Sequence, residues 1–202
     1  MKEMGSRERL LQAAMEEFLE KGYAGARTTE IARRAATSHS MLHYYFSSKE
    51  QLYVQVEAEA VALVRALAEG VCATEGLPAV ERVVETVAGQ FEFLCAHPAL
   101  PRFLVSEVMG KPGPTERLRE GVAEAVQRAV ASLQRTLDGA ARQGVVAQTD
   151  AAMLLWDIVS VNMAAVVAAP LFVAADGDWQ GYLLARRQEN IQLILNRISP
   201  NM

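Results

Sequence analysis

Cysteine, histidine and aromatic residues are scarce in this 202-residue chain, which has 2 Cys, 3 His and 6% aromatic residues. The two cysteines, Cys72 and Cys95, lie far apart, which excludes a disulfide-rich secreted scaffold. No apolar leader opens the sequence, so we expect a protein of the reducing cytoplasm. Both thiols are expected to be inert, because neither has a neighbouring His or Lys in helical register.

Catalytic motifs are also missing from the sequence. It contains no glycine-rich phosphate loop, no HExxH and no GxSxG. The third histidine, His97, precedes Pro98 at an expected helix end and has no paired acid. We therefore predict that the protein is not an enzyme and that it has no cofactor.

A hydrophobic run long enough to cross a membrane is absent as well. The most apolar segment covers residues 151–175, but Asp157 lies near its middle and Pro170 lies inside it. No cluster of Lys or Arg flanks the segment. We predict a core or interface helix here and no membrane partner.

Alanine is abundant, and apolar residues recur at helical spacing along most of the chain, which predicts an all-α fold. Thr28 and Ser38 are expected N-caps, Ser48 opens a capping box with Gln51, and Gly22 is placed for a left-handed C-cap. The predicted helices cover about residues 6–21, 28–35, 38–46, 48–70, 78–96, 99–109, 115–143, 150–169 and 178–198.

The two short helices at about 28–35 and 38–46, joined by a tight turn, have the pattern of a helix-turn-helix, which lays its second helix in the DNA major groove. Leu42 and Phe46 would hold that second helix against its neighbours. The opposite face offers hydrogen-bonding groups to base edges and phosphates from His39, Ser40, His43 and Tyr44.

The charge distribution agrees with a DNA-binding segment. The whole chain has a net charge of −4, which excludes a protein that is basic over its entire surface. Residues 27–49, however, carry Arg27, Arg33, Arg34 and Lys49 against Glu30 alone, whereas residues 50–202 have an acidic excess. The positive charge is concentrated on the predicted helix-turn-helix.

Further residues of segment 7–53 stand at a characteristic mutual spacing: Phe18, Gly22, Tyr23, Thr28, Thr29, Glu30, Ile31, Ala32, Ala35, Ser38, Leu42, Tyr44, Tyr45, Phe46, Lys49, Glu50 and Leu52. Together they resemble the N-terminal signature of the TetR family of bacterial transcriptional regulators. The resemblance implies a helix-turn-helix DNA-binding domain at 1–48 and a larger helical effector-binding and dimerisation domain at 49–202. Two residues depart from the family pattern, because Ala36 replaces the usual turn glycine and Thr37 the usual valine. A positive φ at Ala36 would cost about 1 kcal/mol.

The resemblance also implies roles in DNA binding. Phosphate contacts are implied for Ser38, Tyr44, Tyr45 and Lys49, together with Thr29 and Arg27. His39, Ser40 and His43 take the positions that face base edges, and Thr28 and Met41 complete the predicted DNA-binding set. The i, i+4 spacing of His39 and His43 would also suit a metal, but no Cys or carboxylate nearby completes a ligand set, so we predict no metal.

The second domain is expected to enclose a small effector. The candidate pocket residues are bulky, soft or weakly polar: Phe91, Cys95, Phe103, Met109, Trp156, Ser160 and Met163. An ordinary hydrophobic core would explain the same residues.

The last two helices are expected to form a homodimer interface of four helices. The candidate interface residues are Ala164, Ala168, Leu184, Ile191, Ile194, Leu195 and Ile198. The alternative is that these apolar residues pack only within one chain.

The prediction from sequence is therefore a homodimeric, ligand-responsive repressor that binds a palindromic operator in double-stranded DNA and is released by a small apolar effector. The alternative is a helical carrier of small ligands, or a partner-binding bundle, without specific DNA recognition. That alternative leaves the basic pair of short helices at 27–49 without a role.

Overall fold

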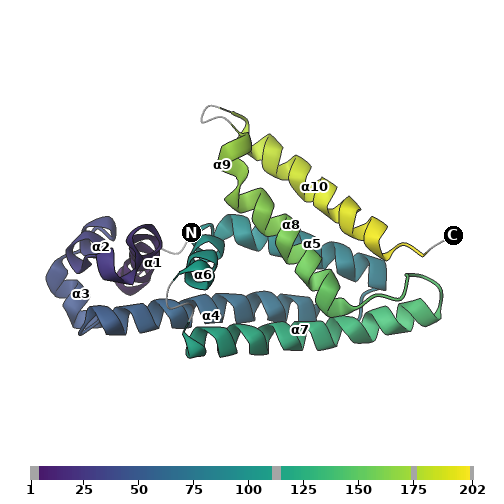
Figure 1. The fold of residues 1–202 in the computed structure, drawn as a ribbon, viewed down its shortest axis with the longest axis horizontal. Helices are drawn as coiled ribbons and strands as arrows, with labels where there is room; N and C mark the ends of the chain where they lie inside the picture. Colours follow the sequence, from purple (N-terminus) through teal and green to yellow (C-terminus); the bar gives the residue numbers. More distant parts are fainter. Residues whose placement is uncertain (1–4, 111–114, 174–176, 201–202) are drawn as a thin grey trace. The chain divides into compact units, whose positions relative to one another are not determined.

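The computed structural model describes residues 5–110, 115–173 and 177–200. These residues form helices and contain no strand, which confirms the predicted all-helical fold (Figure 1). The helices are α1 (Ser6–Gly25), α2 (Thr28–Arg34), α3 (His39–Tyr45), α4 (Lys49–Ala73), α5 (Ala79–Ala96), α6 (Ala99–Met109), α7 (Glu116–Arg142), α8 (Ala151–Val167), α9 (Ala169–Phe172) and α10 (Trp179–Ile198).

The chain divides into two compact units that do not follow a single cut in the sequence. The first unit consists of Met1–Leu63 and Ala99–Gly121, and the second of Val64–Pro98 and Val122–Met202. The predicted domain boundary after residue 48 falls within the first unit and stays a prediction.

The first unit is organised around α1, which packs against α2 and α6, while α2 packs against α3. Leu10, Ala14 and Phe18 recur every four residues on α1 and are almost completely buried. Leu42 and Phe46 supply the apolar side of α3 and the residue after it, and both are buried as predicted.

The core of the second unit is formed where α5, α8 and α10 pack on one another (Figure 1). Leu133 and Leu137 of α7 join this core, and so do Ile194 and Ile198 of α10. The last two side chains are only 2% and 1% exposed, because they fill the interior of their own chain. The prediction that Ile194 and Ile198 face a partner subunit is therefore wrong.

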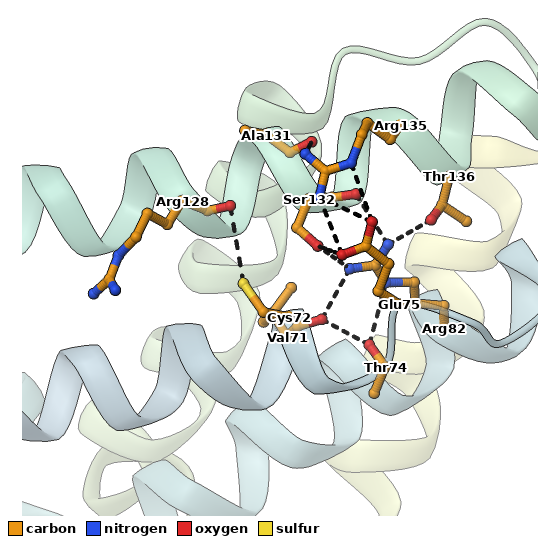
Figure 2. Close-up of polar contacts among 10 residues, drawn as sticks. All are labelled: Val71, Cys72, Thr74, Glu75, Arg82, Arg128, Ala131, Ser132, Arg135 and Thr136. Carbon is orange, nitrogen blue, oxygen red and sulfur yellow. Dashed lines mark hydrogen bonds and ion pairs between the residues drawn. The ribbon is translucent and has the colours of Figure 1, made fainter.

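A buried arginine joins three helices of the second unit (Figure 2). The Arg82 guanidinium of α5 donates to the backbone oxygens of Val71, at 2.9 Å, and Ser132, at 3.0 Å. It also donates to the hydroxyls of Ser132, Thr136 and Thr74. Arg82 is fully buried, and burial lowers its pKa. Its donors satisfy one carbonyl in the last turn of α4, which no further helical N–H would reach.

Candidate nucleic-acid interface

The start of α3 is fixed by a side-chain cap. Ser38 has extended backbone angles, and its Oγ accepts a hydrogen bond from the Met41 N–H at 3.1 Å, which confirms Ser38 as the predicted N-cap. Ser48 caps α4 in the same way, with Oγ accepting from the Gln51 N–H at 3.1 Å. Both ends of α3 are thus tied to defined turns.

The turn before α3 contains a strained residue. Ala36 stands in the place of the usual turn glycine and has φ of 50°, in the left-handed region where a Cβ is disfavoured. Gly22 also has a positive φ, of 64°, as predicted. It interrupts α1 rather than ending it, because the chain continues as a further helical turn to Gly25.

The outer face of α3 is open to solvent. His39, Ser40, His43 and Tyr44 are exposed, with Tyr44 reaching 78%, whereas Leu42 is fully buried beneath them. The rings of His39 and His43 meet edge to face, with their centroids 4.4 Å apart. This places hydrogen-bonding groups on the side of α3 that faces away from the core, where base edges could be reached.

Thr28 has a different role from the one predicted. The N-cap of α2 is Arg27, and Thr28 is the first helical residue. The Thr28 hydroxyl instead lies 3.1 Å from Nε2 of His39, within hydrogen-bond distance. This contact connects the start of α2 to the start of α3 and orients one of the predicted base-reading side chains.

Acidic residues neutralise part of the predicted basic patch. Arg34 forms ion pairs with Glu20 at 2.5 Å and with the fully buried Glu17 at 3.2 Å. Arg33 pairs with Glu30 at 2.5 Å, and its hydrogen bonds lower the pKa of Glu30 to about 2. Arg33 and Arg34 therefore stabilise α2 and its packing on α1, so their charges are largely compensated.

Two cations of the segment have no acidic partner among the described residues. The side chain of Arg27 is exposed, and its backbone N–H donates to Glu17 at 3.3 Å. Lys49 Nζ lies 4.9 Å from the centre of the Tyr23 ring and 3.4 Å from the Ala24 carbonyl oxygen. These contacts hold the Lys49 ammonium at the start of α4 without cancelling its charge.

The predicted DNA-binding residues lie at or just before the start of α2, along α3 as far as its last residue, Tyr45, and at the start of α4. Met41 is half-buried, Tyr45 is 37% exposed, and Thr29 is exposed. All of them belong to the first unit. Whether they contact DNA stays a prediction.

The predicted pocket residues are divided between the two units. Phe103 is buried and Met109 is 80% exposed in the first unit, whereas the other predicted residues belong to the second. A cavity of about 250 Å³ in the second unit is lined by other residues, from α4 and α5: Ala66, Leu67, Gly70, Val71, Thr74, Glu85, Thr86, Gly89, Gln90 and Phe93. The sequence prediction named none of these residues, most of which are small or polar, and Phe93 is the one aromatic residue of the lining.

An exposed stripe follows α8: Met153, Trp156, Ser160, Ala164 and Val167. Trp156, predicted to line a pocket, is 69% exposed on this stripe. Of the predicted interface residues on α10, Leu184 is 58% exposed, and Ile191 and Leu195 are partly buried against the core. Ala168 is half-buried at the end of α8.

Two further findings concern classes of site. The described residues contain no group of three metal-ligating side chains, so the His39 and His43 pair stands without a third ligand there. Within the same residues, no helix combines the length and the apolar character that crossing a membrane requires.

A capped α3 with an open polar face, held against α2 by a buried apolar side, defines a helix-turn-helix protein. Residues 10–56 match the family model described as bacterial regulatory proteins, tetR family. This match confirms the predicted resemblance of the helix-turn-helix segment to the TetR family.

Curated relatives match over part of the chain. The chain is 34% identical over 92 residues to the HTH-type transcriptional regulator YdgC of Bacillus subtilis, covering 44% of this chain and 47% of that protein. It is 37% identical over 51 residues to the HTH-type transcriptional repressor NicS of Pseudomonas putida, covering 25% and 24%. The chain thus spans less than half the length of these relatives. Both are transcriptional regulators rather than enzymes.

Solved structures match over nearly the whole chain. A fatty acid metabolism regulator of Clostridium perfringens aligns with a TM-score of 0.69 at 22% identity, covering 93% of this chain and 97% of that one. The transcriptional regulator SCO4942 of Streptomyces coelicolor aligns with a TM-score of 0.62 at 25% identity, covering 98% and 100%. The fold beyond the helix-turn-helix is thus shared with regulators of this kind.

Proposed function

We propose that this protein is a cytoplasmic, homodimeric transcriptional repressor that binds a palindromic operator and is released by a small effector. The observation that carries the proposal is α3, whose N-terminus is capped by Ser38 and whose outer face exposes His39, Ser40 and His43. A recognition helix must be held rigidly and must expose a polar face, and α3 meets both requirements. The match of residues 10–56 to the tetR family supports the same function.

The residues around α3 would have two roles in DNA binding, contact with phosphates and contact with base edges. Lys49, Arg27, Tyr44 and the hydroxyl of Thr29 supply groups for phosphates, which position the protein without distinguishing sequences. His39 supplies a ring for a base edge, and its contact with Thr28 limits the directions in which that ring can point. Sequence preference would therefore depend on His39, and overall affinity on the cations.

The exposed stripe of α8 supports dimerisation. A soluble monomer rarely leaves a Trp at 69% exposure beside further apolar side chains, as Trp156 is here beside Met153. The small residues Ser160 and Ala164 on the same stripe would let a second helix approach closely. A second copy of the chain would cover this surface and bring two α3 helices to the two half-sites of a palindrome, about 34–36 Å apart.

Binding to the DNA upstream of the protein's own gene tests this function. In a gel-shift titration at several salt concentrations, we expect specific binding. The logarithm of the binding constant should fall linearly with the logarithm of the salt concentration. Lys49→Ala should weaken binding to all sequences about equally and reduce the salt slope by about one. His39→Ala should cost about 1–3 kcal/mol at one position of the operator and relax the preference there.

His97→Ala is the matched control, because His97 is the histidine that lies in the second unit, at the end of α5. It should leave both affinity and preference unchanged. Equal affinity for operator and random DNA, or no dependence on salt, would contradict the proposal. That result would favour the alternative of a helical ligand carrier or partner-binding bundle.

A further inference from the structure

A chain of buried side-chain amides connects three helices of the second unit. Asn162 of α8 donates through Nδ2 to Oε1 of Gln90 on α5, at 2.9 Å, and to the Val87 carbonyl oxygen, at 3.0 Å. Asn190 of α10 donates through Nδ2 to Oδ1 of Asn162, at 2.9 Å. Arg186 of α10 donates to Oδ1 of Asn190 at 3.0 Å. Asn162 and Asn190 are completely buried, so these contacts exclude water.

The two ends of the chain fix the orientation of every amide in it. A guanidinium can only donate, so the Asn190 group that meets Arg186 must be its oxygen, and its nitrogen must meet Asn162. A backbone carbonyl can only accept, so the Asn162 group that meets Val87 must be its nitrogen. The same nitrogen meets Gln90, whose oxygen is therefore the atom used within the chain. Nε2 of Gln90 is left as a free donor.

Gln90 lines the 250 Å³ cavity between the second half of α4 and α5. The residue is only 7% exposed, and Nε2 has no acceptor among the described residues. Nε2 is accessible from the cavity rather than sealed in the core, so an acceptor on a bound molecule could replace solvent there. The cavity thus contains one donor that is held in place by the amide chain and lacks a partner.

Two glycines keep the cavity open. Gly70 lies in the last turns of α4 and Gly89 in the middle of α5, and both line the cavity. A Cβ added to either would meet no atom within 4 Å, so packing does not require glycine there. Glycine inside a helix is less stable than alanine. Both residues are exposed and line the cavity, so a larger side chain at either would extend into its open space.

The remaining walls set the chemistry of an occupant. Leu67, Val71 and Phe93 make most of the lining apolar. The exposed carboxylate of Glu85 also lines the cavity and has no cationic partner among the described residues. An anionic molecule would meet this negative charge, whereas a neutral one would not.

We propose that this cavity binds a small, mainly apolar and uncharged molecule whose hydrogen-bond acceptor, such as a ketone or amide oxygen, receives the Gln90 Nε2–H. The inference rests on the proposed function, in which an effector binds this protein, and it names the chemical class of that effector. The cavity is slightly smaller than the ~300–1,000 Å³ of sites for drug-sized ligands. The occupant is correspondingly small.

Three one-ring probes separate the parts of this inference: acetophenone has a neutral acceptor, isopropylbenzene has nearly the same shape without one, and benzoate is an anion. Binding is followed in the full chain by the side-chain amide signal of Gln90 in 15N-resolved NMR, assigned by its loss in Gln90→Met. Acetophenone should shift this signal and bind roughly three- to tenfold more tightly than isopropylbenzene, as expected for one net hydrogen bond. Benzoate should bind more weakly than acetophenone.

Gln90→Met keeps the length of the side chain and removes the donor. It should bring the affinities for acetophenone and isopropylbenzene to within twofold of each other while leaving isopropylbenzene bound. Gly89→Leu should abolish binding of both by filling the cavity. Gly139→Leu is the matched control, because a Cβ at Gly139 of α7 also meets no atom closer than 4.0 Å, and it should leave binding unchanged.

The inference is overturned if no probe binds, if acetophenone has no advantage over isopropylbenzene, or if binding survives Gly89→Leu. Operator binding of the same protein without any probe is measured in parallel. Intact operator binding without acetophenone binding would overturn the assigned effector chemistry alone. Failure of specific DNA binding would overturn the proposed function, whatever the probes do.

Discussion

Two arginines, one in each unit of the molecule, are held in opposite ways. In the first unit, arginines such as Arg33 lie near the surface and pair with carboxylates in solvent. In the second, the principal polar groups are buried: Arg82 is held by carbonyls and hydroxyls, and Asn162 by other amides. Surface ion pairs leave a helix free to meet a charged partner, whereas buried hydrogen bonds fix the shape of an interior.

The difference extends to the backbone of the two units. The first unit has a non-glycine residue in the left-handed region, Ala36, at the turn that sets the angle of α3. The second unit has a glycine, Gly144, where φ is 71° after α7. Gly22 of the first unit also suits its positive φ, so the strain of that unit lies at the turn before α3.

Removal of the buried arginine is expected to have the largest effect on stability. Arg82→Leu removes the five hydrogen bonds of the buried guanidinium, so the Val71 carbonyl keeps only the Thr74 hydroxyl as donor and the Ser132 and Thr136 hydroxyls lose theirs. We expect a loss of about 3–5 kcal/mol in the free energy of unfolding, which urea denaturation followed by circular dichroism measures. Arg82→Lys should recover only part of the loss, because an ammonium cannot reach all these acceptors.

Arg33→Leu is the matched substitution in the first unit. Arg33 makes an ion pair with Glu30, but its side chain is 72% exposed. Its removal should change the free energy of unfolding little, because an ion pair exposed to solvent contributes little to stability. Equal losses for Arg82→Leu and Arg33→Leu would show that burial does not separate the two units in the way argued above.

A substitution in the α8 stripe tests association of the second unit, with a smaller expected effect. If the second unit carries the dimer interface, Trp156→Glu puts a charge into a buried apolar contact and should weaken association by about 2 kcal/mol or more. Analytical ultracentrifugation should then show the mass of one chain, 22.0 kDa, at concentrations where the unchanged protein has twice that mass.

Val108→Glu is the control, because Val108 of α6 has the same 69% exposure as Trp156 but belongs to the first unit. It should leave the dimer intact. A dimer that survives Trp156→Glu, or one that Val108→Glu dissociates equally, would place the interface elsewhere.

The sequence predicted those elements that depend on local contacts. The Ser38 cap, the positive φ of Gly22 and the burial of Leu42 follow from residues a few positions apart, and the structure has all three. Thr28 was misjudged as a cap because the contact that its hydroxyl makes is with His39, across the turn. Periodicity alone does not reveal such contacts between helices.

The second unit was less predictable because its site depends on contacts across long stretches of sequence. Helical periodicity shows that Ile194 and Ile198 share an apolar stripe, but not whether that stripe meets its own chain or a partner. Trp156 is a bulky aromatic residue of the kind that lines pockets, but it lies on the surface. No sequence signal marked the cavity residues Gly89 and Gln90. The cavity forms only where α5 lies beside α4, and Gln90 is oriented by its contact with Asn162 of α8.

The smallest expected effect concerns the two turns with positive φ. Ala36→Gly removes the clash of a Cβ in the left-handed region, and we expect it to raise the free energy of unfolding by about 0.5–1 kcal/mol. Gly144→Ala introduces the same clash in the second unit and should lower it by a similar amount. Both are measured by urea unfolding at 25 °C against the unchanged protein.

Because these two substitutions are chemical opposites at turns of similar φ, their effects should nearly cancel in the double variant, since the sites lie in different units. Ala36→Gly that lowers stability would mean that the turn before α3 is not strained. A gain in stability accompanied by weaker operator binding would instead show that the alanine fixes α3 at an angle that a glycine leaves loose, so the first unit retains the strain because DNA binding requires it.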